Sequence, residues 1–99
     1  MPETVAASID RALEAYTVLA ELGEAIEDEW SYLNDLTEAW RERLTEVDER
    51  RGAEPASEAV VVAIDRAIAE VGRISDPHRA IDWLSTFPQV VLLALGEQP

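Results

Sequence analysis

The chain of 99 residues contains no cysteine, no lysine and only one histidine. Without cysteine, disulfide bonds, thiolate catalysis and cysteine-ligated zinc are excluded together. The four glycines are scattered along the chain, so no glycine-rich phosphate-binding loop is present. No run of about 18 apolar residues exists, and the amino terminus lacks a basic patch followed by an apolar segment. We therefore expect a cytoplasmic protein that uses neither nucleophilic nor P-loop chemistry.

Acidic residues dominate the charged positions. Twenty-one aspartates and glutamates stand against eight arginines, which gives a formal net charge of −13. Such an excess repels nucleic acid and anionic membranes at long range, so we expect neither as a direct ligand and favour a basic protein partner. With 47% apolar residues the chain is too hydrophobic for an acidic disordered tail. Its length predicts a single folded domain over residues 1–99.

Apolar residues recur in alternating steps of four and three through the first half of the chain. A seven-residue repeat kept for this long predicts a helix that packs lengthwise on another helix, as in a coiled coil. Only Gly23 and Thr37 interrupt the apolar character of this seam. Its positions are Val5, Ile9, Ala12, Tyr16, Leu19, Gly23, Ile26, Trp30, Leu33, Thr37, Trp40, Leu44 and Val47.

Gly23 decides whether this half is one helix or two. A glycine inside a helix costs about 1 kcal/mol relative to alanine, but no proline, asparagine or serine lies beside it to form a turn. We therefore favour one long helix over about 3–50, continuous or kinked at Gly23, with two helices broken near Gly23 as the alternative. Arg50 and Arg51, followed by Gly52 as a left-handed cap, predict its carboxyl end.

The second half begins with a short linker, 53–56. Ser57 then offers an N-cap for a helix that ends near Ile74. Asp76 followed by Pro77 predicts the N-cap and the first residue of another helix.

Pro88 limits how far that helix extends. Thr86 and Gln89 have the spacing of a capping box, so we expect a last short helix over 87–95 that ends at Gly96. The fold class is thus all-α: a helical bundle in which two or three shorter carboxyl-terminal helices pack on the long one. Since these helices are too short to cover the whole seam, we expect a homo-oligomer, most simply a homodimer.

The acidic residues that lie off the apolar seam form the candidate binding surface. We predict a noncatalytic adaptor or inhibitor that presents this face to a basic protein, and a mimic of nucleic acid is one version of it. Trp83 joins the surface as an aromatic anchor, because tryptophan is frequent at binding hot spots. The acidic positions are Asp35, Glu38, Glu42, Glu46 and Glu49.

A second hypothesis is a magnesium-dependent helical hydrolase. Glu21, Glu24 and Asp28 are spaced to share one side of a helix, and oxygen ligands suit Mg²⁺. The run Glu21-Leu22-Gly23-Glu24 resembles the E-x-x-E element of all-helical nucleoside triphosphate pyrophosphohydrolases, although their second element, E-x-x-D, is absent. A third hypothesis is a structural dimerisation module whose acidity reflects a saline cytoplasm.

Overall fold

The computed structural model describes residues 3–26 and 30–99, which fold into four α-helices. The all-α helical bundle predicted from the sequence is confirmed. No helix within the described residues is long and apolar enough to cross a membrane. The helices are α1 (Val5–Glu24), α2 (Trp30–Arg51), α3 (Glu58–Gly72) and α4 (Pro77–Ala94).

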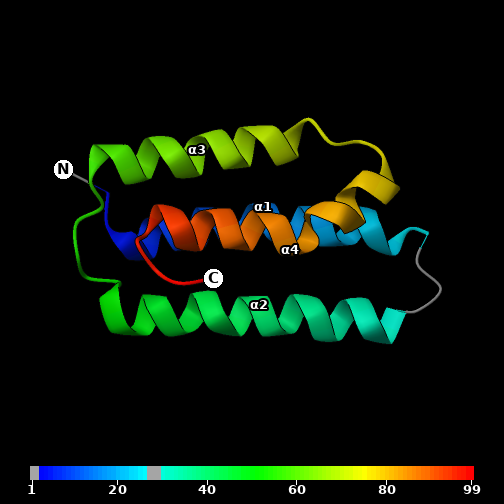
Figure 1. The fold of residues 1–99 in the computed structure, drawn as a ribbon, viewed down its shortest axis with the longest axis horizontal. Coiled ribbons are helices and arrows are strands. Elements are labelled where there is room, and N and C mark those ends of the chain that lie inside the picture. Colours follow the sequence, from blue (N-terminus) through cyan, green and yellow to red (C-terminus); the bar gives the residue numbers. More distant parts are fainter. Residues whose placement is uncertain (1–2, 27–29) are drawn as a thin grey trace.

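The two central helices of the bundle are α1 and α4. They lie one over the other, with α2 along one side and α3 along the other (Figure 1). Successive helices run in opposite directions, and α1 contacts all three others. Within the described residues α2 and α3 do not touch each other, so each leaves a broad outer face to solvent. The molecule measures 43 × 25 × 20 Å.

The first half of the chain is a pair of helices. Since α1 ends at Glu24 and α2 begins at Trp30, the favoured prediction of one helix over about 3–50 is wrong and the alternative of a break near Gly23 is correct. In the sequence the seven-residue spacing continues through Gly23, Ile26 and Trp30, so the seam gave no sign that α1 ends at Glu24. Of its positions, Ile26 is 41% exposed and Trp40 is half-buried. The side chain of Trp30 lies outside the description. The buried positions are Val5, Ile9, Ala12, Tyr16, Leu19, Gly23, Leu33, Thr37, Leu44 and Val47.

Gly23 is the last residue but one of α1, and its lack of a side chain serves packing. A Cβ atom there would lie 3.1 Å from Cγ1 of Ile81, so the missing side chain lets α1 approach α4 closely. Beyond it, the amide of Ala25 donates to the carbonyl of Leu22 (3.3 Å) and the amide of Ile26 to that of Gly23 (3.4 Å). These are the tightened bonds with which a last helical turn commonly closes.

Because the seam is divided between α1 and α2, another helix of the same chain can cover it. The sequence predicts a homodimer because one long helix would need a second chain along its apolar side. In the structure α4 covers both α1 and α2, and Val91 and Leu92 near its carboxyl end are fully buried. The homodimer therefore stays a prediction, without that support.

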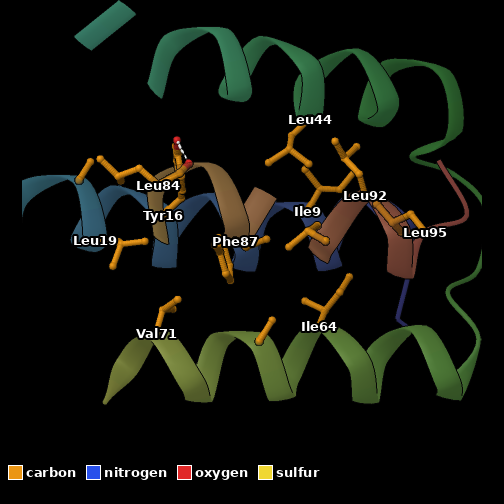
Figure 2. Packing of buried hydrophobic residues seen from close by; sticks show 14 of the residues in the cluster. Ile9, Tyr16, Leu19, Leu44, Ile64, Val71, Leu84, Phe87, Leu92 and Leu95 are labelled. Carbon is orange, nitrogen blue, oxygen red and sulfur yellow. Dashed lines mark hydrogen bonds between the residues drawn. The ribbon is translucent and has the colours of Figure 1, made fainter. Parts of the chain in front are cut away.

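Helix α4 continues through Pro88, so the predicted short last helix over 87–95 is wrong. A proline inside a helix leaves the carbonyl four residues earlier without its usual amide donor, and here that carbonyl belongs to Leu84. The hydroxyl of Tyr16 on α1 donates to it at 2.6 Å (Figure 2). Thr86, placed inside the helix, directs its hydroxyl to the carbonyl of Asp82 and caps nothing.

Tyr16 is held firmly in this position. Its side chain is fully buried, and its ring stacks on Phe87 with centroids 6.2 Å apart and planes at 13°. Burial raises the pKa of its phenol, which keeps the hydroxyl protonated and able to donate. A side chain from α1 thus completes the hydrogen bonding of α4.

Two of the three helix starts predicted in the second half are confirmed, those at Ser57 and Asp76. The Ser57 hydroxyl accepts from the amide of Val60 at 3.3 Å, and the Asp76 carboxylate accepts from the amide of His78 at 3.0 Å, with Pro77 as the first helical residue. Each cap satisfies an amide that the first helical turn leaves without a partner.

Both predicted glycine caps end helices, by different means. Gly96 has a φ of 77° after α4, and the amide of Glu97 reaches back to the carbonyl of Leu92 at 2.9 Å, as in a Schellman motif. Gly52 follows α2 without the left-handed backbone that was expected. A side chain there would collide with Asp48, so Gly52 is required for space.

The segment between α2 and α3 caps the start of α1. The amide of Val5 donates to the carbonyl of Glu54 (2.8 Å), and the amide of Ala6 donates to that of Gly52 (3.0 Å). In return, the amide of Ala56 donates to the carbonyl of Glu3 (2.7 Å). This connection therefore fixes α1, α2 and α3 at one end of the bundle.

Candidate functional site

The outer face of α2 carries the acidic residues predicted to bind a partner. Their helical spacing puts them opposite the buried residues Leu33, Leu44 and Val47, which face the core. The first and the last are 14 positions apart, or about 21 Å along the helix. All five are exposed: Asp35, Glu38, Glu42, Glu46 and Glu49.

A shallow open depression of about 360 Å³ lies on this face. Four of its six lining residues are glutamates, so a cationic side chain entering it would meet carboxylates on several sides. The lining residues are Glu38, Arg41, Glu42, Thr45, Glu46 and Glu49.

Among the five acids, Glu46 differs because it is already paired. It accepts hydrogen bonds from Arg43 at 2.5 Å and from Arg50 at 3.1 Å. In the described part of the chain, the other four form no ion pair with an arginine. On the outer face of α2, uncompensated negative charge is therefore concentrated in Asp35, Glu38, Glu42 and Glu49.

Arg41 lies inside the row but turns away from it. Its guanidinium lies 5.8 Å from the ring centroid of Tyr16, in a cation–π contact, and donates to the hydroxyl of Thr17 at 3.2 Å. Arg41 thus holds α2 against α1, and its direction leaves Glu38 and Glu42 without a pair.

The arginines at the carboxyl end of α2 are held by Glu97, which follows α4. Its carboxylate accepts from Arg50 at 2.5 Å and from Arg51 at 2.7 Å, and Arg43 lies 3.6 Å away. Hydrogen bonds from Arg50 and then Arg51 lower the pKa of Glu97 to about 2. These contacts occupy the arginines at the carboxyl end of the acidic row. Nothing in the sequence predicts them, because their partners are more than 40 residues apart.

Arg11 is engaged in the same way at the start of α1. It donates to both oxygens of Glu3, at 2.7 and 2.8 Å, and also pairs with Asp65 on α3. The Ser8 hydroxyl also donates to Glu3, and these hydrogen bonds, chiefly those from Arg11, lower the pKa of that carboxylate. Arg11 thus joins the chain start to two helices and is not free to balance α2.

Trp83 is not part of the acidic row. It lies on α4 and packs half-buried against the core. Its role as a binding anchor stays a prediction, and the structure assigns it a packing role.

The residues of the magnesium hypothesis are only partly visible. Glu21 and Glu24 are exposed near the end of α1, whereas Asp28 lies outside the described residues. Among residues 3–26 and 30–99, no three histidine, aspartate or glutamate side chains are grouped so as to hold a metal ion.

Sequence reasoning missed an apolar groove between α1 and α3. Two adjoining hollows share Ala15, Val18 and Ile68, and together they run from Arg11 to Ile74. The sequence contains a signal for it, because Ala15, Val18 and Leu22 form a second apolar stripe beside the seam.

No protein-family model, no curated protein and no solved structure matches this chain.

Proposed function

We propose that this protein is a noncatalytic protein-binding module, an adaptor or inhibitor that presents the outer face of α2 to a basic protein. The observation that carries the proposal is the set of four carboxylates on that face, Asp35, Glu38, Glu42 and Glu49, which have no ion pair in the described chain. The nearest arginines are held elsewhere, so the face keeps its negative field.

Electrostatics favours such a use. A single-signed surface speeds encounter with an oppositely charged partner and selects against partners of the same sign. The depression around Glu38, Glu42 and Glu49 gives lysine or arginine side chains a place where several carboxylates converge. A nucleic-acid-binding protein is one class of partner with enough positive charge, which is the mimic version of the proposal.

The four unpaired acids of this face take part in no described contact that stabilises the fold, which supports a role in binding. Removing charge from the four unpaired acids breaks no hydrogen bond or ion pair found in the described chain, whereas removing Glu46 or Glu97 breaks several. The unpaired acids therefore contribute little to the fold, and a partner is what they are available to hold.

The test begins with capture from an extract of the cells that make the protein. The tethered protein is washed at low salt and eluted with stepwise increasing salt, and the eluted proteins are identified. We expect a basic protein, released at moderate salt, whose affinity falls steeply as ionic strength rises. A captured partner that is acidic, or whose affinity is insensitive to salt, would contradict the proposal.

A further inference from the structure

The groove between α1 and α3 is a second surface, built differently from the α2 face. Its floor is apolar, made chiefly by Ala15, Val18 and Leu22 from α1 and by Ile68 from α3. Val18 is 63% exposed, the highest value among the large apolar side chains of the described chain. No residue that lines the depression on α2 also lines this groove, so the two surfaces are separate.

The edge of the groove along α1 is acidic. Glu14 lines it and Glu21 lies seven residues further along α1, so both follow the same edge of the helix, and both are exposed. The one cation in the lining, Arg11, is already bound by Glu3 and Asp65. An occupant therefore meets an apolar floor with negative charge beside it.

We propose that this groove binds one amphipathic helix of a partner protein, with the helix's apolar side on Val18 and Ile68 and its lysines or arginines beside Glu14 and Glu21. Arg11 and Leu22 are 11 positions apart, or about 16 Å along α1, which matches about three turns of a docked helix. Binding here is independent of the proposed function of the α2 face.

Charge decides between such a helix and a second copy of this chain. Each copy carries a net charge of −13. In a symmetric dimer formed through this groove the same patch faces itself, which brings Glu14 and Glu21 of one copy towards those of the other. Like charges brought together in this way oppose association, whereas a cationic helix is attracted by the same two carboxylates.

The test uses three 14-residue peptides labelled with a fluorophore. The first has leucines on one helical side and lysines on the other, the second has the same composition in an order that gives no apolar side, and the third has glutamate in place of lysine. We expect the first to bind, the second to bind much more weakly, and the third not to bind. Equal binding of the first two would overturn the proposal, because bulk charge alone would then explain it.

Protein variants locate the binding. Val18→Asn should weaken binding of the first peptide by about tenfold, because an apolar contact is lost. The control is Leu93→Asn on α4, where the side chain is 61% exposed, and it should leave that affinity unchanged. The double variant Glu14→Gln with Glu21→Gln should also weaken binding of the first peptide and reduce the salt dependence of that binding. Circular dichroism checks that each variant is folded.

Two results would contradict the groove as the site. Val18→Asn binding as well as the parent is one, and it would leave the α2 proposal untouched. The other is a parent protein that sediments as a dimer and becomes a monomer on Val18→Asn, because a second copy would then occupy the groove.

Discussion

The contact between α1 and α4 and the outer face of α2 use their polar groups in opposite ways. At the first, the Tyr16 hydroxyl satisfies the Leu84 carbonyl that Pro88 leaves without a donor, and no buried side-chain polar atom of the described residues lacks a hydrogen-bond partner. On the second, Glu38 and Glu42 lie exposed and unpaired, and no described contact depends on them.

This difference shows where binding is compatible with the fold. A surface whose charges already stabilise the structure loses stability when a partner draws them away, as Glu97 would if it left Arg50 and Arg51. A surface whose charges form no ion pair loses no stability when a partner binds them, so its full electrostatic field is available to that partner. Mutations in the two regions should therefore differ in their effect on the free energy of unfolding.

The largest effect should come from Tyr16→Phe, which removes only the hydroxyl. The Leu84 carbonyl would then be buried without a donor, and we expect the free energy of unfolding to fall by about 2 to 3 kcal/mol. Urea denaturation measures the loss. In a Pro88→Ala background the new amide of residue 88 can bond this carbonyl, so the same change should cost less by about 1 kcal/mol or more. Additive losses would mean that Tyr16 does not replace the missing amide.

Gly52→Ala should have the next largest effect. Its Cβ would collide with Asp48 and disturb the segment whose Gly52 carbonyl accepts from the amide of Ala6. We expect a loss of about 1 to 2 kcal/mol in the free energy of unfolding. Gly72→Ala is the matched control, because nothing lies within 4 Å of its added Cβ. Equal losses from both changes would show that the space at Gly52 is not the constraint.

Glu97→Gln should cost less and should depend on pH. The pKa of Glu97 is about 2 in the folded state, below its ordinary value of 4.5, so its charge stabilises the fold fully above pH 4.5. This stability is lost as the pH falls from 4.5 towards 2. Denaturation midpoints of parent and variant should therefore differ at pH 7 and converge near pH 2. A gap that stays constant over this range would contradict the ion pairs with Arg50 and Arg51.

The smallest effect on stability should come from the α2 face itself. Replacing Glu38, Glu42 and Glu49 together by glutamine removes three unpaired charges from a chain of net charge −13. We expect the free energy of unfolding to stay within about 0.5 kcal/mol of the parent or to rise, since self-repulsion decreases. Thermal unfolding measures it. A clear loss would show that these acids do stabilise the fold, and the contrast between the two regions would fail.

Local chemistry made part of this fold predictable. The Ser57 and Asp76 caps and the Gly96 ending depend on neighbouring residues, and the periodic seam identifies the buried side of α1 and α2 correctly. The acidic row was predictable for the same reason, because it is the complement of the seam on α2.

What the sequence did not predict depends on contacts between distant residues. The end of α1 at Glu24 is hidden because the spacing of the seam continues in the sequence through Ile26 and Trp30. Pro88 is tolerated because of Tyr16, 72 positions away, and the hold of Glu97 on Arg51 likewise joins the end of the chain to α2. The pairing of α1 with α3, which makes the apolar groove, is equally invisible in one sequence.

The most direct test of the α2 face compares two variants that remove the same charge from different places. One carries glutamine at Glu38, Glu42 and Glu49. The other neutralises three exposed acids of α1 and α4 that form no ion pair in the described chain: Asp10, Glu24 and Asp82. The measurement is the calorimetric Kd of each for the captured basic partner at low salt. We predict that the α2 variant binds about tenfold or more weakly and that the other stays close to the parent. Equal weakening of both, or unchanged binding by the α2 variant, would contradict the account.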